Sequence, residues 1–441
     1  MTITAPVATD EAPVGATITT GNQEPVTIPV SRYIDPAFAA LEMERLWPRV
    51  WQVACSVDHV ASPGDVYEYR CGPYSTLIVR GVDGELRAFQ NVCRHRGSAL
   101  CDGGAAGMTE LRCPFHRWTW DLAGNLREVP SRRGFGVLRN EDYGLFPVAV
   151  GTWGPMVFVN PSLDAPPLAD FLEGVQEDIA WVGLEDFRCE YLVSLPVPGN
   201  WKVVSDGFSE TYHVQGLHRE MLPIADDVNG PQRLWSHHGK LEQRYGVPSP
   251  RFRTAPSDQE VWDAFIEVMG TRIGVTEQGA FPGGGPVRDV LAAGVRSVGA
   301  AQGVAYDRFT DDQLLTMEQY NLFPNVSLVV FPDLFSILRS RPGPTPDEAF
   351  MDVFHFSRRA PGAPYARPAD VDLPPTDDPP LGLVLGQDAK QIGRAHRGLK
   401  QPGFTRMTLS REECRILNLH RNLERWLGIS PSEITGAADP V

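Results

Sequence analysis

The 441-residue sequence lacks any apolar run of about 18 residues, the length that a helix needs to cross a bilayer. Its start, MTITAPVATDEAPVGATITTGNQEP, also lacks the basic residues and continuous apolar stretch of a secretory signal. We therefore expect a cytoplasmic protein with no membrane segment. Residues 1–30 are interpreted as a flexible N-terminal arm.

Cysteine and positive charge are both scarce. Seven cysteines are too few for a disulfide scaffold in a chain of this length, so a reducing compartment is expected. The 40 lysines and arginines are outnumbered by 55 acidic residues, which gives a formal net charge of −15. This surplus of negative charge disfavours general binding to nucleic acid or to anionic membranes. No flavin or nicotinamide fingerprint is found in the sequence.

The length and the changing pattern along the chain predict two domains. From about Gly64 to Asn160 the sequence is dominated by short β-rich runs, such as STLIVR and GVDGELRAF, which predict a hairpin with an Asp-Gly turn. The Pro-rich stretch PSLDAPPLAD at 161–170 is the best linker candidate. Beyond it, helical stretches alternate with long strands, and VSLVVFPDLFSILRSRP and AFMDVFHFSRRAP are expected to be antiparallel neighbours.

Two further segments carry clear local signals. Residues 279–304 are Gly-rich and are expected to be irregular, either a mobile loop or a flap over a pocket. The chain then closes on a predicted helix that begins with an S-x-x-E capping box at Ser410 and Glu413. Gly428 stands where a helix-terminating glycine is expected.

The segment from Asn91 to Leu126 holds two Cys-His pairs, Cys93 with His95 and Cys113 with His116, separated by 17 residues. Two thiolates and two imidazoles fit either a structural zinc site or a Rieske [2Fe–2S] cluster. The H-x3–5-H pair on a helix, typical of zinc fingers, is missing. Turns rich in Gly and Pro surround both pairs and would let backbone N–H groups face cluster sulfurs. The cluster is therefore favoured over zinc.

A second constellation lies in GNWKVVSDGFSETYHVQGLH, where four residues separate His213 from His218. Two such imidazoles and a carboxylate would form a facial triad that leaves positions open on Fe(II) for oxygen. Two unrelated histidines are the alternative, and the pair His237 and His238, to which we assign no role, shows how easily such pairs arise. The carboxylates that compete as third ligand are Asp370, Asp372, Asp377, Asp378 and Asp388.

CRHRG together with CPFHRWTWDLAGNL closely resembles the Rieske domain of the ring-hydroxylating oxygenase α subunits. The downstream NWK, DGF and YH elements resemble the iron-binding segment of the same subunits. The resemblance covers nearly the whole chain beyond the arm. It implies that Cys93 and Cys113 bind one iron of the cluster, and that His95 and His116 bind the other.

The resemblance also implies that His213 and His218 bind a mononuclear Fe(II). Asp388, in a Gln-Asp step that enters a late helix, would be the third ligand. Glu210 stands where better-known members have an aspartate that bridges the two metal centres, so the bridging role is expected of Glu210. An ordinary buried acid is the alternative. Asp206, a weaker candidate, and the following Gly207 replace the commoner Glu-Asn.

The implied fold class is α+β. An all-β Rieske [2Fe–2S] domain is expected at 51–165, and a larger α+β helix-grip (START-like) catalytic domain with an antiparallel sheet at 166–441. A helix at 31–50 would pack on the catalytic domain. The subunits are expected to assemble as a head-to-tail homotrimer, α3 or α3β3, in which His116 of one chain, Glu210 and His213 of the next form the electron path.

The implied function is that of a terminal oxygenase. It would use O2 and electrons from a separate ferredoxin or flavin reductase to hydroxylate or cis-dihydroxylate an aromatic or apolar small molecule. Oxidative O- or N-demethylation is the alternative within the family. A Rieske electron carrier with a degenerate second domain and a zinc-stapled binding protein are the alternatives from other classes.

The substrate pocket is expected between roughly residues 220 and 390, with an apolar or aromatic lining. Arg339 and Arg341 could pair a substrate carboxylate, and strand arginines held in salt bridges are the alternative. The candidate lining residues, several of which could equally be plain core, are Phe208, Leu217, Met221, Leu222, Phe323, Asn325, Val329, Phe335 and Phe354.

Overall fold

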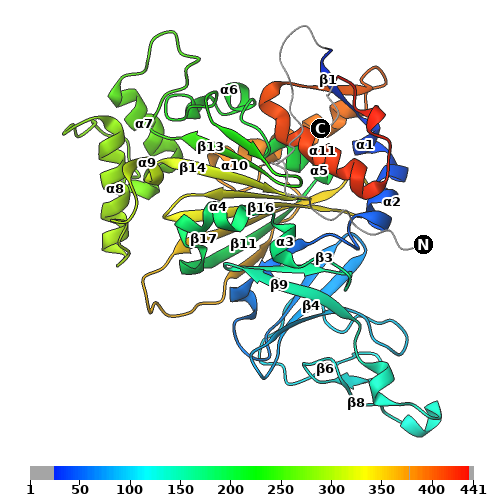
Figure 1. The fold of residues 1–441 in the computed structure, drawn as a ribbon. Helices are drawn as coiled ribbons and strands as arrows, with labels where there is room; N and C mark the ends of the chain where they lie inside the picture. Colours follow the sequence, from blue (N-terminus) through cyan, green and yellow to red (C-terminus); the bar gives the residue numbers. More distant parts are fainter. Residues whose placement is uncertain (1–23, 377, 437–441) are drawn as a thin grey trace.

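Two large sheets organise the chain in the computed structural model, which describes residues 24–376 and 378–436 (Figure 1). The first has six strands in the order β2-β10-β9-β5-β4-β3, with a three-stranded sheet β6-β7-β8 beyond it. Their bounds are β2 Gln52–Ser56, β3 Val66–Cys71, β4 Tyr74–Arg80, β5 Leu86–Gln90, β6 Leu111–Arg112, β7 Thr119–Trp120, β8 Leu126–Glu128, β9 Pro147–Trp153 and β10 Met156–Asn160. The predicted β organisation from about Gly64 to Asn160 is confirmed.

The second sheet has eight strands in the order β12-β13-β14-β15-β16-β17-β11-β18. All of its neighbours are antiparallel except β11 and β18, which are parallel. The predicted pairing of the two long strands is confirmed by β16 and β17, in register from Leu334↔Ser357 to Pro342↔Ala349. The bounds are β11 Phe187–Val197, β12 Gln232–Leu234, β13 Gly239–Arg244, β14 Thr316–Leu322, β15 Val326–Val330, β16 Leu334–Pro342, β17 Ala349–Arg358 and β18 Ala369–Asp372.

Helices pack on this second sheet, and the candidate ligands of the mononuclear iron lie on them or at their ends. Helix α5 contacts β16 and β17, and the long helix α10 contacts both α5 and β11. The expected C-terminal helix is α11, which ends at Gly428 in the left-handed conformation; the Ser410 backbone N–H donates to Glu413 just before it. The bounds are α3 Leu168–Phe171, α4 Val175–Ile179, α5 Trp201–Gly207, α6 Val214–Leu217, α7 Asp258–Met269, α9 Asp311–Leu314, α10 Leu383–Leu399 and α11 Cys414–Leu427.

The N-terminal segment differs from the expectation of one arm and one helix. Residues 26–29 form strand β1 (Val26–Pro29), which pairs with β19 (Arg406–Leu409) and buries Val26 and Ile28. Two helices follow, α1 (Ser31–Ile34) and α2 (Pro36–Arg45), because Asp35 is extended and caps α2 ahead of Pro36. Residues 1–23 of the expected arm lie outside the described residues.

The N-terminal helices pack against the elements around α5 and α11. On α2, the carboxylate of Glu42 accepts hydrogen bonds from Lys202 Nζ at 2.6 Å and from Trp201 Nε1 at 3.0 Å, all three side chains being buried. On α1, Arg32 pairs with Glu424 at 2.7 Å. Because a buried charge without a partner is costly, these pairs fix where the N-terminal helices lie.

The Gly-rich segment 279–304 is not irregular throughout, because residues Val287–Ala301 form helix α8. Val287, Leu291 and Val295 recur on one buried face of it, which is the periodicity of an amphipathic helix. Its glycines allow close packing: a Cβ added at Gly299 would lie 2.2 Å from the Tyr306 ring. The expectation of a loop over the whole segment was therefore wrong.

The junction between the two sheets is polar at its centre. Arg339 on β16 pairs with the buried Asp352 on β17 at 2.8 Å and donates to the carbonyls of Val53 and Ala54 on β2, each at 2.7 Å. Arg341 binds the same carboxylate at 2.5 Å. Both arginines are therefore structural, and the alternative of strand arginines in salt bridges is the correct one.

No helix of the described residues is both long enough and apolar enough to span a membrane.

Gly299→Ala is predicted to lower the free energy of unfolding by about 1–3 kcal/mol, because the new methyl group overlaps the Tyr306 ring in a packed interface. Chemical unfolding measures the change. Ser297→Ala, on an exposed position of the same helix, is the control and should stay within about 0.5 kcal/mol of the parent. Equal stability of all three proteins would show that α8 does not pack as described.

Candidate metal centres and the adjoining cavity

The two Cys-His pairs stand on two loops with the same backbone design. In the first loop, the Cys93 N–H donates to the Ser98 carbonyl and the Gly97 N–H donates to the Cys93 carbonyl. The second loop repeats both hydrogen bonds, from the Cys113 N–H to Trp118 and from the Arg117 N–H back to Cys113. Each returns through a left-handed residue, with φ of 78° at Gly97 and 62° at Arg117.

These loops bring the four predicted ligands together. The thiols of Cys93 and Cys113 are buried, and the rings of His95 and His116 lie 4.6 Å apart between centroids. The His95 ring stacks on Trp118, and its Nδ1 is buried without a hydrogen-bond partner among the described residues. A buried nitrogen that lacks a partner fits a metal ligand, so these residues suit a Rieske cluster.

The second predicted set also converges. His213 and His218 flank the short helix α6, and Asp388 lies on α10. Asp388 Oδ1 lies 2.9 Å from His218 Nε2 and 3.9 Å from His213 Nε2, and one ligand atom from each residue lies within 4.8 Å of the others. One metal ion could be reached by all three side chains.

On both imidazoles, the Nδ1 edge, which faces away from Asp388, makes a hydrogen bond. His213 Nδ1 donates to Glu210 Oε1 at 2.6 Å, and His218 Nδ1 donates to the amide oxygen of Gln387 at 2.5 Å. A neutral imidazole carries one N–H, so each Nε2 presents a lone pair toward the Asp388 carboxylate. A divalent metal ion between these three groups would accept both lone pairs and the carboxylate, so the donor set fits such an ion.

The other candidate ligands have different positions. Asp370 on β18 accepts from His59 Nε2 at 2.9 Å, Asp378 pairs with Lys390 at 2.7 Å, and Asp372 is exposed. Asp377 lies outside the described residues. Of the remaining histidines, His237 contacts Glu173, and His238 is buried between the Phe171 carbonyl and the Phe323 N–H.

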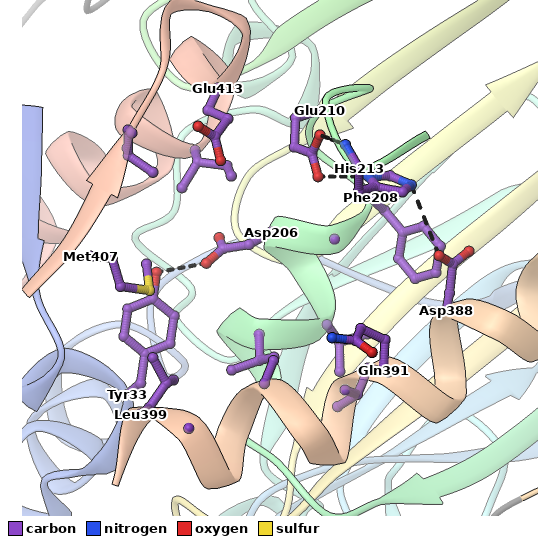
Figure 2. Close-up of a pocket in the computed structure, with 18 of the residues that line it drawn as sticks. Tyr33, Asp206, Phe208, Glu210, His213, Asp388, Gln391, Leu399, Met407 and Glu413 are labelled. Atoms are coloured by element: carbon purple, nitrogen blue, oxygen red, sulfur yellow. Dashed lines mark hydrogen bonds and ion pairs between the residues drawn. The ribbon is translucent and has the colours of Figure 1, made fainter. Parts of the chain in front are cut away.

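A cavity of about 670 Å³ adjoins the metal site (Figure 2). It is lined by α5, α10, β19 and the residues between α5 and α6, and both His213 and Asp388 face it. Of the nine residues predicted to line the substrate pocket, Phe208 and Leu217 line this cavity. The other seven do not line it. Phe323, Phe335 and Phe354 are buried in the main hydrophobic core, and Met221 lies in a second core around α7 and α8. Leu222 and Val329 pack against these cores, and the Asn325 amide donates to the Ser340 carbonyl.

No residue of 279–304 lines this cavity among the described residues, so the segment is not a flap over it in this structure. Two residues of the site, one in the cavity and one beside the metal ligands, could not be assigned a role from the sequence. Tyr33 reaches the cavity from α1, and its hydroxyl donates to Asp206 at 2.6 Å. Gln387 was visible only as part of the Gln-Asp step, with nothing in the sequence to show that it holds the His218 ring.

Two family profiles match the chain. Residues 50–142 match the Rieske [2Fe-2S] domain, and residues 181–429 match the ring hydroxylating alpha subunit (catalytic domain). The second match covers more than half of the chain. The chain belongs to the ring hydroxylating alpha subunit family. The family confirms the expected α+β fold and the two cofactor classes, a Rieske [2Fe–2S] cluster and a mononuclear non-heme iron.

Several proteins with different named activities are similar in sequence to this chain. The glycine betaine monooxygenase oxygenase subunit of Pseudomonas aeruginosa PAO1 is 30% identical over 209 residues, 47% of this chain and 48% of that protein. The carnitine monooxygenase oxygenase subunit of Escherichia coli K12 is 29% identical over 52% of this chain and 61% of its own length. Biphenyl 2,3-dioxygenase subunit alpha of Rhodococcus jostii is 29% identical over 56% and 58%.

The chain thus spans about half the length of the curated relatives that it matches. Solved structures agree on the fold. A quaternary ammonium Rieske monooxygenase in complex with L-carnitine has a TM-score of 0.65 at 17% identity, covering 91% of this chain and 95% of that one. Naphthalene 1,2-dioxygenase from Rhodococcus sp. has a TM-score of 0.63 at 18% identity, covering 92% and 95%.

Asp388→Ala is predicted to abolish binding of the mononuclear iron while the Rieske spectrum stays unchanged, because the two sites are built from separate segments of the chain. Iron per chain should fall from about three to about two, with labile sulfide unchanged. Asp378→Ala is the matched control, since Asp378 pairs only with Lys390 among the described residues and should retain all iron. Full iron retention in Asp388→Ala would place the third ligand elsewhere.

Proposed function

We propose that this chain is the terminal oxygenase component of a cytoplasmic Rieske non-heme iron system, which inserts oxygen from O2 into a C–H bond of a small organic molecule. The observation that carries the proposal is the facing arrangement of His213, His218 and Asp388 in a chain that also holds the two Cys-His loops. The first set suits iron with open positions, and the second suits a Rieske cluster.

The proposed division of the chain follows from this. Residues 51–165 would hold the cluster through Cys93, Cys113, His95 and His116, and residues 166–441 would hold the mononuclear iron. When bound, the two centres supply electron transfer and oxygen activation. The chain's own residues orient both centres: Glu210 and Gln387 hold the imidazole protons at Nδ1 and so keep each Nε2 free.

Oxidative hydroxylation of an amine substrate, followed by loss of the alkyl group, is the reaction that we favour. The relatives named as glycine betaine and carnitine monooxygenases support this choice. The expected hydroxylation of an aromatic or apolar molecule, and with it a role in aromatic hydrocarbon catabolism, is less well supported by these relatives. The biphenyl dioxygenase relative keeps cis-dihydroxylation of an apolar ring as the second candidate.

The proposed assembly is a head-to-tail trimer, α3 or α3β3. Within one chain, the end of the first domain that carries β6 and β8 points away from helices α6 and α10, which lie across the large sheet (Figure 1). An electron path between the two centres of one chain would therefore be long. In a closed ring, His116 of one chain can meet Glu210 of the next, with electrons supplied by a separate ferredoxin or reductase.

Glu210→Gln is predicted to keep both metal centres but to slow coupled turnover by about 10- to 100-fold, because it removes the charged acceptor that holds His213 Nδ1. Product formation per O2 consumed measures the effect. Glu210→Asp, which restores a carboxylate at the position, should recover part of the rate. Normal coupled turnover in Glu210→Gln would exclude the bridging role.

Mixed trimers test the inter-subunit path. Cys113→Ser chains and Asp388→Ala chains should each be inactive alone, while trimers formed by co-expression should regain activity. With random assembly, about a quarter of the interfaces pair an intact cluster with an intact iron site, so about a quarter of the parent rate is expected. Mixed trimers that contain both chains and show no activity would contradict the head-to-tail path.

A further inference from the structure

The cavity beside the metal site extends well beyond the space that an iron ion and oxygen require. His213 and Asp388 lie at one end of it, while Tyr33, Met407 and Leu399, the last residue of α10, lie at the other (Figure 2). Its volume of about 670 Å³ is within the usual range of small-molecule sites. A substrate could therefore place one end at the metal and the rest of its body along α5.

The charged groups of this cavity are predominantly of one sign. Four carboxylates line it, those of Asp206, Glu210, Asp388 and Glu413, and no lysine or arginine lines it among the described residues. Two of these acids have partners at the metal site: Asp388 faces the histidine Nε2 atoms, and Glu210 holds His213. Asp206 and Glu413 have no such task.

Asp206 is incompletely satisfied. One carboxylate oxygen accepts the Tyr33 hydroxyl at 2.6 Å, and the other is buried with no hydrogen-bond partner among the described residues. The nearby ammonium of Lys202 is paired with Glu42 at 2.6 Å and makes no direct ion pair with Asp206. Tyr33 is itself fixed by His420, whose Nε2 lies 2.7 Å from the Tyr33 hydroxyl. Among the described residues, the Asp206 carboxylate therefore has one hydrogen bond and no direct ion pair.

We infer that this cavity binds an organic cation, an alkylated ammonium whose charged nitrogen is attracted by Asp206 and Glu413 and whose alkyl groups extend toward His213 and Asp388. This inference rests on the proposed function, because it takes the cavity to be the substrate site. It assigns Asp206 and Glu413 as the residues that recognise charge and Tyr33 as the residue that positions Asp206.

The walls of the cavity suit such a ligand. The aromatic rings of Tyr33, Phe208 and Phe404 line it, and ring faces attract ammonium groups. Met407 and Leu399 supply apolar surface for alkyl groups. A substrate that carries a carboxylate at the Asp206 end would meet like charge, which disfavours an aromatic acid bound in that direction.

Direct binding to the iron-loaded protein tests the inference without turnover. The probes are choline and 3,3-dimethylbutan-1-ol, in which a neutral carbon replaces the quaternary nitrogen at nearly the same shape. Calorimetry should show choline binding at least about tenfold more tightly than the alcohol, because only choline gains the Coulomb attraction of the two carboxylates. Equal affinities, or no detectable binding of choline, would overturn the inference.

Variants locate the charge recognition. Asp206→Asn should weaken choline binding about tenfold and leave the alcohol unchanged, since asparagine can still accept the Tyr33 hydroxyl. Glu413→Gln, which keeps an acceptor for the Ser410 N–H, is a second variant with the same expected direction. Glu277→Gln, an exposed acid outside the cavity lining, is the matched control. Unchanged choline affinity in both cavity variants would contradict the assignment.

The pH profile supplies a second readout. Burial raises the pKa of Asp206 to about 7; the neighbouring Glu413 and Glu210 also raise it, while the Tyr33 hydroxyl and Lys202 oppose the rise. Choline stays charged at every pH, so its affinity should increase roughly tenfold from pH 6 to pH 8 as Asp206 ionises. This slope should flatten in Asp206→Asn, and an unchanged slope there would exclude Asp206 as its source.

The binding and turnover experiments can contradict the inference and the proposed function independently of each other. Tight choline binding without oxygenation of any amine would leave the inference standing and contradict the proposed function. Oxygenation of a neutral substrate with equal binding of the two probes would keep the function and overturn the inference.

Discussion

The whole site depends on the orientation of two imidazole rings. Glu210 and Gln387 each accept the Nδ1 proton of one histidine, and this leaves two Nε2 lone pairs directed at a single carboxylate, that of Asp388. Without those two hydrogen bonds the rings could rotate or change tautomer, and the three ligands would no longer present matching lone pairs. Glu210 also accepts the backbone N–H of His213 at 2.9 Å, so the turn that presents the ring is fixed by the same carboxylate.

The surrounding fold serves to hold three separate segments at this point. Helix α5 is held by the buried ion pair of Lys202 with Glu42 on α2, so the N-terminal helices help to position the helix that precedes the candidate iron ligands. Helix α10 brings Gln387 and Asp388 side by side against the same region. The buried Arg339 and Asp352 pair anchors the large sheet to the Rieske-containing part of the chain.

Sequence patterns were sufficient where chemistry is encoded by local spacing. Cys93, His95, Cys113 and His116 lie on tight loops whose geometry follows from a few neighbouring residues, and His213 with His218 is a pair of the same local kind. Asp388 could be chosen as the third ligand because it follows Gln387, and this Gln-Asp dipeptide at a late helix resembles that of the α-subunit family. The strands of both sheets were also predictable, since alternation of buried residues and turn signals is local.

The cavity could not be predicted in this way. Its wall is built from α1, α5, α10, β19 and the start of α11, so its residues are distant in sequence and share no periodic signal. Most aromatic residues expected to line it instead fill the sheet core, because an apolar side chain has the same sequence signature in either place. In helix α8, two of the glycines that suggested a loop allow close packing instead, Gly299 against Tyr306 and Gly294 against Ile273. These contacts are seen only in the folded structure.

The most direct test of the central claim is the metal content of the purified protein together with its electron paramagnetic resonance spectrum after dithionite reduction. Two centres in one chain predict about three irons and about two acid-labile sulfides per chain, and a reduced spectrum of the Rieske type. Zinc in place of iron, with no labile sulfide, would contradict the account at both centres.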